Sequence, residues 1–362
     1  MPAELLGRSR DELRAYCQAL GEPAYRGAQI YHALYAGRRF DFAQMTDLPA
    51  KLRARLAEEA RISLPQVVRR YTSTDASVRY LLALAAENAR PASVEAVFMP
   101  SEDRQTICIS TQAGCAVDCH FCLTAELGLI RNLSAGEILA QVLLPLEEHT
   151  ERLAPRTNVV LMGQGEPLLN YDAVMEAVRI MLDTEGVGLS AKHVTLSTSG
   201  IVPGIERLAK EAVRPKLAIS LSASTDEQRD ALMPINRKYP LAKLLEACRR
   251  YPLRPWERLT FEYVMLGEVN DSPEDARRVV RLLAHLRAKV NLIPWNPGEL
   301  PYREPAPERV EEFRRILAEK GLPVFVRTSR GRDVMAACGQ LALKEVDSQQ
   351  FTVDGHPHTQ QS

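Results

Sequence analysis

The stretch TICISTQAGCAVDCHFCLTAELG, residues 106–128, decides the fold of this chain. It begins with an apolar run at residues 107–110 that predicts a short buried strand. It continues into a loop that holds Cys115, Cys119 and Cys122 in a C-x₃-C-x₂-C arrangement. Three thiolates at this spacing can converge on one iron–sulfur cluster and bind three of its four irons. A zinc site completed by Cys108 is the weaker interpretation, because Cys108 lies on the predicted strand and not in the loop.

The charge and the cysteine content narrow the class of protein further. The chain has 46 basic and 46 acidic side chains in 362 residues, so its net charge of zero provides no long-range attraction for a polyanion. No stretch of about 18 residues is free of charge, and the amino terminus lacks the apolar run of a secretory signal. We therefore expect no membrane span and a cytoplasmic protein. Seven cysteines, an odd number in a reducing compartment, favour metal binding or chemistry over a disulfide framework.

From about residue 105, short apolar runs alternate with helix-length amphipathic segments. This alternation predicts an α/β fold with a parallel sheet. Six such units are too few for a closed eightfold barrel, so we expect a partial (β/α)₆ barrel with functional residues in the loops after its strands. The predicted strands cover residues 107–110, 158–162, 193–196, 216–221, 260–265 and 290–293, and the predicted helices cover residues 135–147, 171–183, 240–250, 275–287 and 307–320.

Smaller segments flank the predicted barrel. Residues 1–70 predict a small, basic helical domain with 12 basic and 8 acidic side chains. Residues 71–104 predict a β-hairpin that leads into the barrel, with strands at residues 79–85 and 94–99. The barrel segment itself covers residues 105–345 and ends in a loop with Cys338. The polar tail at residues 346–362 is predicted to be disordered.

The cysteine loop after the first strand of a six-unit barrel resembles the radical S-adenosylmethionine (SAM) superfamily. Other segments are similar to the RlmN-type adenine-C2 RNA methyltransferases. The sibling Cfr-type enzymes, which methylate C8 of the same adenine, are the alternative; the proline of GEP and the PWNP run favour the C2 branch. The segments that carry the resemblance are NLSAGEI (132–138), LMGQGEPLLN (161–170), VTLSTSG (194–200), MPINRKYP (233–240), YVMLGEVND (263–271), VNLIPWNP (290–297), AACGQL (336–341) and, near the amino terminus, GEPAYRGAQIYHALY (21–35) and FAQMTDLPAKLR (42–53).

The resemblance implies one 4Fe-4S cluster, bound by the three cysteines of the loop and by SAM, and two SAM molecules per turnover. It implies that Cys338 accepts a methyl group from the first SAM, and that a radical from the second SAM converts this group into a methylene radical that adds to the adenine. Cys108 matches a resolving cysteine that closes a transient disulfide, and Glu95 in VEAVFMP matches a proton acceptor. The residues alone also allow another interpretation, in which Cys338 and Cys108 are inert buried cysteines and Glu95 is an exposed strand residue. Either Glu95 or the Cys108 thiolate can remove the ring proton.

The resemblance also implies a set of SAM contacts, most of them at the ends of the predicted strands. Two positions depart from the family pattern: Gln164 stands where methionine is usual, and Ser222 stands where histidine is usual. We expect the first to change only packing, and the second to remove an imidazole from the SAM pocket. The implied contacts are Gly165, Glu166, Ser197, Ser220, Leu221, Ser222 and Asn296.

The partners implied by the resemblance are 23S rRNA, tRNA and an electron donor such as flavodoxin or ferredoxin, and we expect a monomer. The adenines concerned lie in loops whose bases can be splayed into a pocket. Basic groups in residues 1–70, 237–239 and 327–332 are candidates for phosphate binding, with a solvated surface as the alternative. A zinc-stabilised, non-catalytic RNA-binding protein is the alternative from another class; the GEP and AACGQL segments argue against it, because a closed zinc site leaves them without a role.

Overall fold

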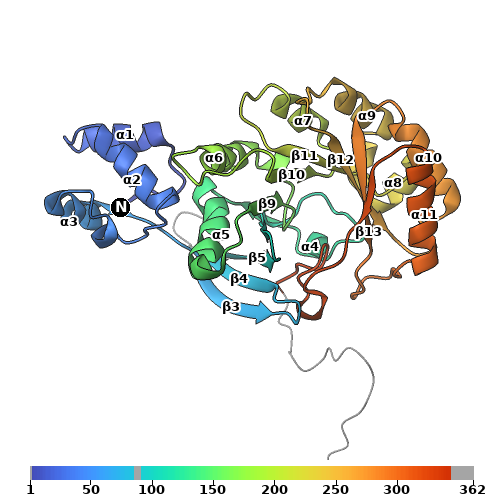
Figure 1. Ribbon diagram of the computed structural model, residues 1–362, viewed down its shortest axis with the longest axis horizontal. Helices are drawn as coiled ribbons and strands as arrows, with labels where there is room; N and C mark the ends of the chain where they lie inside the picture. Colours follow the sequence, from blue (N-terminus) through green and yellow to red (C-terminus); the bar gives the residue numbers. More distant parts are fainter. Residues whose placement is uncertain (1, 85–90, 344–362) are drawn as a thin grey trace, which may run out of the picture.

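One open sheet forms the centre of the molecule in the computed structural model, which describes residues 2–84 and 91–343 (Figure 1). Its strand order is β14-β13-β12-β11-β10-β9-β6-β5-β4-β3. The strands from β6 to β14 pair in parallel, and those from β3 to β6 pair in antiparallel fashion. The strands are β3 (Gln66–Thr72), β4 (Val78–Leu84), β5 (Ala92–Pro100), β6 (Gln105–Cys108), β9 (Thr157–Leu161), β10 (Val194–Thr198), β11 (Lys216–Ser220), β12 (Leu259–Met265), β13 (Ala288–Pro294) and β14 (Val324–Val326).

The parallel strands and their helices form the expected partial barrel. In Figure 1 the helices follow one another around the outside of the strands. Alternation decides which side chains face them: on β11, Leu217 and Ile219 are fully buried in the core beneath the helices, so Ser220 points to the inner face. The helices are α5 (Ala135–Glu148), α6 (Tyr171–Leu182), α7 (Val202–Leu208), α8 (Asp226–Leu232), α9 (Leu241–Arg250), α10 (Pro273–Leu283) and α11 (Pro307–Glu319), and four short 3-10 turns are η2 (Thr150–Arg152), η3 (Pro167–Leu169), η4 (Pro234–Arg237) and η5 (Arg332–Val334).

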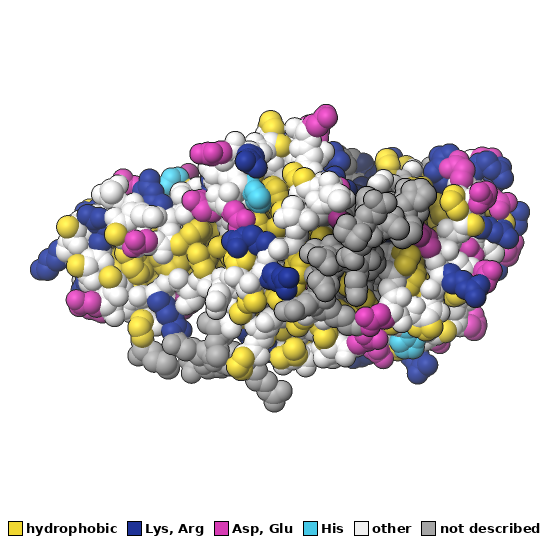
Figure 2. All heavy atoms as spheres, turned by 90° about the horizontal axis from the view of Figure 1, so that it is seen from below, with side chains coloured by type: hydrophobic (Ala, Val, Ile, Leu, Met, Phe, Trp, Pro, Cys, Tyr) yellow, Lys and Arg dark blue, Asp and Glu magenta, His cyan; other side chains and the backbone are white. Residues whose placement is uncertain are grey.

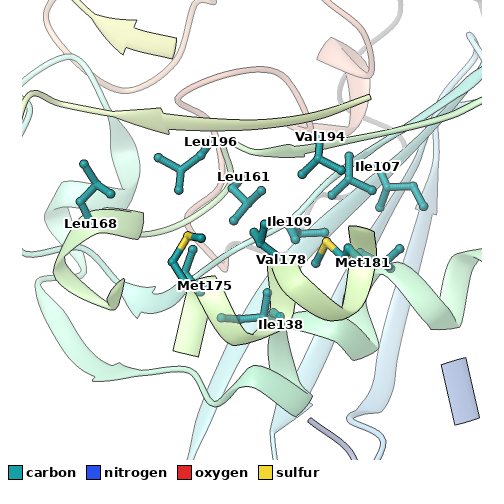
Figure 3. Packing of buried hydrophobic residues seen from close by; sticks show 14 of the residues in the cluster. Ile107, Ile109, Ile138, Leu161, Leu168, Met175, Val178, Met181, Val194 and Leu196 are labelled. Atoms are coloured by element: carbon teal, nitrogen blue, oxygen red, sulfur yellow. The ribbon is translucent and has the colours of Figure 1, made fainter. Parts of the chain in front are cut away.

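The core between sheet and helices is built from the outward side chains of the first strands. Figure 3 shows side chains of β6, β9 and β10 meeting those of α5 and α6. Burial of these apolar groups provides the driving force that holds the helices on the sheet. The labelled members of this core are Ile107, Ile109, Ile138, Leu161, Leu168, Met175, Val178, Met181, Val194 and Leu196.

The antiparallel end of the sheet contains one strand more than the sequence predicted. The expected hairpin corresponds to β4 and β5, but β3 (Gln66–Thr72), which was assigned in part to the helical domain, pairs with β4. Only Tyr71 is buried on β3, and a register shift interrupts its pairing between Val67 and Arg69. An edge strand exposed on both faces lacks the apolar alternation that reveals a strand in a sequence.

Three helices form the small amino-terminal unit: α1 (Arg10–Ala19), α2 (Tyr25–Tyr35) and α3 (Ala50–Glu59), with the short elements β1 (Ala3–Glu4), β2 (Ala60–Arg61) and η1 (Phe42–Gln44). Ser9 begins α1 with a capping box that involves Glu12. Gly27 lets α2 approach α1 closely, because a Cβ there would lie 2.4 Å from Leu13 O. Tyr31 connects the unit to the barrel, since its hydroxyl donates a 2.9 Å hydrogen bond to Asp183.

Some local predictions differ from the structure. The first barrel strand ends at Cys108, earlier than predicted, and the cysteine loop lies inside a separate two-stranded sheet of β7 (Gln112–Gly114) and β8 (Leu129–Asn132), next to α4 (Leu123–Glu126). Helices α7 and α8 were not predicted, because seven residues contain too few turns for a clear apolar period. The predicted tail at residues 346–362 falls outside the described residues. Within the described ranges, no helix is long and apolar enough to cross a membrane.

Candidate active site

The cysteine loop lies at the carboxyl end of the parallel strands. Its base is held by the β7–β8 pair, where Cys115 N–H donates to Gly128 O at 2.9 Å. A turn with Asp118 at φ +57° brings the chain back, and Cys122 N–H donates to Cys119 O at 3.0 Å. All three cysteines are half-buried.

The three thiols act on one another electrostatically. Burial, followed by the nearby Cys122 and Cys115, raises the pKa of Cys119 well above its usual range. Burial also raises the pKa of Cys115 to about 11, and Cys122 contributes. The three thiols therefore lie near enough to disfavour one another's ionisation, and a positively charged group would stabilise them as thiolates.

The GQGEP loop after β9 lies against the β6–β7 segment. Gly165 has φ +96°, and a Cβ on it would lie 2.6 Å from the Cβ of Gln112, so only glycine fits. Glu166 is buried and holds two loops together: Oε1 accepts from Leu168 N–H (3.0 Å), and Oε2 accepts from the N–H and hydroxyl of Ser199 (both 2.7 Å). Burial raises the pKa of Glu166, although the Ser199 donors oppose this. Its carboxylate thus serves the architecture of the loop.

The residues expected at the strand ends differ in how far they are available to a ligand. Ser197 and Ser220 are half-buried on the inner face, whereas Leu221 is fully buried. Ser222 is also fully buried at φ +48°, and its hydroxyl accepts a 3.3 Å hydrogen bond from Val264 N–H. Its side chain is therefore engaged within the protein.

Cys338 and Cys108 come together on the inner face although 230 positions separate them in the sequence. Cys338 is exposed to solvent, and Cys108, on β6, is half-buried. Burial, and then the neighbouring Cys338, raises the pKa of Cys108 to about 12. Surrounding protein and then Glu262 raise the pKa of Cys338. Asn296 holds the loop, because its Nδ2 donates to Cys338 O at 3.1 Å.

The segment at residues 330–343, which carries Cys338 and is called the catalytic segment below, is tied down at its start by the β3–β4 turn. Asp75 Oδ2 accepts from Arg330 Nε (2.9 Å) and from Gly331 N–H (3.0 Å). Conversely, Asp333 of the catalytic segment accepts hydrogen bonds from two residues of the turn, from the Ser73 hydroxyl (2.5 Å) and from Thr74 N–H (2.9 Å). With the bond from Arg330 Nη2 to Asp75 O (2.9 Å), five hydrogen bonds join two parts of the chain that are more than 250 residues apart.

Glu95 ties down the other end of the catalytic segment. It lies on β5 with no exposed surface, so the interpretation as an exposed strand residue is wrong. Its Oε1 accepts from Arg79 Nη1 at 2.7 Å, and its Oε2 accepts from Leu343 N–H at 3.0 Å. Burial raises the pKa of Glu95, and the charge of Arg79 opposes that rise.

Comparisons with known proteins bear on this geometry. Residues 109–283 match the Radical SAM superfamily, and residues 3–62 match the ribosomal RNA large subunit methyltransferase N-terminal domain. The chain is 51% identical to a probable dual-specificity RNA methyltransferase RlmN of Koribacter versatilis, over 91% of this chain and 99% of that protein. It is 46% identical to dual-specificity RNA methyltransferase RlmN of Anaeromyxobacter dehalogenans, over 94% of this chain and 92% of that protein. The chain belongs to the RlmN family, within the radical SAM superfamily.

A solved structure supports the same assignment at the level of the fold. A radical SAM methyltransferase from Sphaerobacter thermophilus superposes with a TM-score of 0.89 at 43% identity, and the match covers 95% of this chain and all of that one. The family resemblance inferred from the sequence is therefore confirmed. The Cfr-type alternative is not favoured, and RlmN membership contradicts the zinc-stabilised, non-catalytic alternative.

RlmN membership implies a 4Fe-4S cluster and SAM, and the residues present fit both. In the described ranges no three His, Cys, Asp or Glu side chains converge as one metal ion would require, but a cluster offers a different iron to each thiolate. In the described part of the chain, the GQGEP loop and the residue that contacts Cys338 O contain buried polar atoms without hydrogen-bond partners. Asn296 Oδ1 and both amide atoms of Gln164 have no hydrogen-bond partner among the described residues. The departure at Gln164 therefore introduces unmet polar groups, and not only a change of packing.

The expected phosphate-binding residues of this RlmN-family chain are largely engaged with other side chains. Arg330 binds Asp75, and Arg332 lies 3.0 Å from Glu304. In the amino-terminal region, Arg38 and Arg55 make similar surface pairs. Figure 2 shows basic and acidic side chains mixed on one face of the molecule. RNA phosphates would have to compete with the carboxylate partners of these four arginines. Arg237 and Lys238, in the predicted group at residues 237–239, are exposed.

Sequence reasoning missed several residues that organise the site. Asp75 and Asp333 lie in turns, and polar turn residues are too common to reveal a long-range role. Arg229, on α8, donates hydrogen bonds to Ser199 O and Ser220 O at two strand ends, and it was missed because α8 was missed. Gln112 Oε1 accepts from Glu166 N–H at 2.8 Å, and its position within the motif TQAGC was the one available signal.

Proposed function

We propose that this protein is a radical SAM RNA methyltransferase that methylates C2 of an adenine in 23S rRNA and of the adenine 3′ to the tRNA anticodon. The observation that carries the proposal is the proximity of Cys338 and Cys108 beside the cysteine loop. The name of the relatives, dual-specificity RNA methyltransferase, supports two RNA substrates. A carbon such as adenine C2 is a poor nucleophile, so a direct transfer from SAM is chemically mismatched, and two cysteines on the inner face provide the alternative route.

Two sets of residues would bind the cofactors, one set for the cluster and the other for SAM. Cys115, Cys119 and Cys122 would each hold one iron of the cluster, and Gly165, Ser197, Ser220 and Asn296 would contact SAM. When bound, the cluster and SAM supply the methyl group and, from a second SAM, a 5′-deoxyadenosyl radical. Glu166, Leu221 and Ser222, which were expected to contact SAM, support this role as the buried frame of the loops.

Cys338 carries the methyl group to the base. Its thiol reaches solvent on the inner face and can meet both SAM and a splayed adenine. The thiol must lose its proton to accept the methyl group, and its raised pKa means that this proton has to be removed at the site. Asn296 keeps the backbone of Cys338 in place during transfer.

Cys108 and Glu95 complete the reaction. The Cys108 thiolate attacks the sulfur of Cys338 and forms a disulfide as the S–CH₂ bond breaks; the bonding electron pair leaves with the base, whose CH₂ group takes up a proton to become the methyl group, and two electrons from a reductant then restore both thiols. Glu95 accepts the proton from adenine C2; its raised pKa favours this role. To reach the adenine, Glu95 has to give up the hydrogen bond that it accepts from Leu343 N–H. The catalytic segment and the proton acceptor therefore move together.

Further parts of the proposal are a one-electron donor such as flavodoxin or ferredoxin, a monomeric state and a cytoplasmic location. A radical reaction that starts at a cluster needs such a donor, and the location follows from the RNA substrates. The predicted domains at residues 1–70, 71–104 and 105–345 belong to the proposal as units of function, although strand β3 crosses the first limit.

One experiment tests the proposed function. The anaerobically reconstituted protein is incubated with SAM, a reductant and RNA, and the digested nucleosides are compared by mass spectrometry with 2-methyladenosine and 8-methyladenosine standards. We expect 2-methyladenosine, and none with Cys338→Ala. Formation of 8-methyladenosine, or zinc without iron in the reconstituted protein, would refute the proposal.

A further inference from the structure

Arg229 is a fully buried arginine that connects the ends of two barrel strands. It lies on α8, with no exposed surface. Its Nη2 donates to Ser199 O (2.6 Å), just beyond β10, and to Ser220 O (3.0 Å), at the end of β11. Its Nε donates to Leu221 O (3.2 Å). One guanidinium thus binds three backbone carbonyls at the edge of the sheet where SAM contacts are proposed.

The helix that carries Arg229 also supports the cysteine loop. His120, between Cys119 and Cys122, donates its N–H to Leu232 O at 3.0 Å. Its Nδ1 donates to Ala231 O at 2.7 Å, because a carbonyl oxygen can only accept. Leu232 belongs to a buried apolar cluster with Phe121, against which Cys119 and Cys122 pack. The carboxyl end of α8 therefore packs directly against the cysteine loop and supports it.

The hydrogen-bond partners of Arg229 are carbonyl oxygens and Asn236 Oδ1 (3.1 Å). The nearest carboxylates, those of Asp226 and Asp230, act from one residue further away, where they accept from Asn236 Nδ2 at 2.9 Å and 2.7 Å. Burial lowers the pKa of Arg229 to about 10, and Cys119 opposes this, so the group stays positive at neutral pH near a thiol of the loop. A buried positive charge stabilises the more negative of two states nearby, because little water screens it.

We infer that Arg229 is a positioning residue that joins the SAM-binding strand ends to the cluster loop, and that its buried charge makes the cluster easier to reduce. The inference rests on the proposed function, since it takes Cys119 as a cluster ligand. Holding Ser199, Ser220 and Leu221 at fixed positions keeps the SAM-facing edge in place. The positive charge favours the reduced cluster, which carries one more negative charge than the oxidised cluster.

Two variants separate the charge from the hydrogen bonds. Arg229→Lys keeps the charge but cannot reach three carbonyls in the planar arrangement of a guanidinium. Arg229→Gln loses the charge and most of the hydrogen bonds. The matched control is Arg214→Lys: Arg214 is also buried and donates to backbone carbonyls, of Glu211 and Pro252, but it lies at the opposite, amino end of β11.

The measurements are iron content, cluster midpoint potential by redox titration followed by electron paramagnetic resonance, SAM affinity by equilibrium binding, and secondary structure by circular dichroism. We expect both Arg229 variants to bind SAM at least about tenfold more weakly. Arg229→Gln should have a more negative potential, by about 59 mV if the reduced-to-oxidised ratio falls tenfold. Arg229→Lys should stay near the wild-type potential, and Arg214→Lys should match the wild type in both measurements. A folded Arg229→Gln variant that loses its iron also supports the positioning role.

Wild-type SAM affinity in both Arg229 variants, or an equal change in potential in Arg214→Lys, overturns the inference. It is also overturned if both Arg229 variants unfold while Arg214→Lys stays folded, since Arg229 then serves stability alone. A wild-type protein that takes up four irons but does not methylate RNA contradicts the proposed function. That outcome does not affect the inference on Arg229, which is tested by SAM affinity and cluster potential.

Discussion

The contact between Asp75 and the catalytic segment makes a prediction that can be worked through quantitatively. Asp75→Asn replaces the carboxylate that binds Arg330 Nε and Gly331 N–H by an uncharged amide. Burial acts to raise the pKa of Asp75, but hydrogen bonds from Ser77, Gly331 and Ser73 lower it from 3.8 to about 2. Ser77 and Ser73 lie in the same turn as Asp75, so only part of this shift comes from the catalytic segment. Because a third of the Asp75 side chain is exposed, its ion pair with Arg330 and its hydrogen bond from Gly331 together contribute about 1 kcal/mol.

The expected result is a local loosening of the catalytic segment. An increase of about 1 kcal/mol in the free energy of its closed state raises the population of the open state roughly fivefold. Amide hydrogens that depend on closure, such as those of Val334 and Ala336, which donate to Gly331 O, should exchange roughly fivefold faster. RNA methylation should slow, because Cys338 lies in this segment. SAM affinity should not change.

Hydrogen exchange followed by mass spectrometry of the peptide at residues 330–343 is the assay. Asp172→Asn, which removes an exposed ion pair with Arg207 between α6 and α7, is the matched control and should leave that peptide unchanged. The lowered pKa of Asp75 means that its contribution is complete above about pH 4 and is lost as the pH falls towards 2. The difference between wild type and variant should shrink over the same range. Equal exchange in wild type and Asp75→Asn at neutral pH would refute the reasoning.

Three further predictions concern the rest of the site. Gly165→Ala should lower SAM affinity and destabilise the protein by at least about 1–2 kcal/mol, because the new Cβ meets Gln112 at a positive φ; thermal unfolding and equilibrium binding measure the two effects. Arg79→Met should cost about 3–5 kcal/mol in unfolding free energy at neutral pH, because it leaves the buried Glu95 carboxylate unpaired, and the loss should diminish at acidic pH where Glu95 is protonated. A loss independent of pH would show that the pair acts through packing alone. Cys119→Ser should abolish iron uptake after anaerobic reconstitution, and full iron content in this variant would remove Cys119 from the ligand set.

Much of the fold was predictable, because the apolar runs of the parallel strands are nearly continuous and bounded by helices. The predicted strands at residues 158–162, 216–221 and 260–265 agree closely with β9, β11 and β12. Strand β3 was not predictable, since an exposed edge strand has no buried face that shapes its sequence. Helices α7 and α8 were missed because they are too short to show a period.

For the candidate site, prediction worked where function depends on close spacing in the chain. Cys115, Cys119 and Cys122 lie within eight residues, so their backbone geometry alone brings them near one another. Glu95 was placed on the correct strand, but its burial and its bond to Arg79 could not be inferred. Both depend on the register of β4 and β5, which pairs Arg79 with Val97 and so sets the two side chains near each other across the ladder.

The sequence by itself determined the chemistry of this protein: the spacing of the cluster cysteines, the glycine of the GQGEP motif, and the family to which the chain belongs. Only the tertiary structure decided which distant residues meet: Cys338 with Cys108, Asp75 with Arg330, and Arg229 with three carbonyls of two strands. The physical reason is that short-range geometry follows from bond lengths and backbone torsions, whereas contacts between distant segments follow from strand order, register and packing of the whole chain.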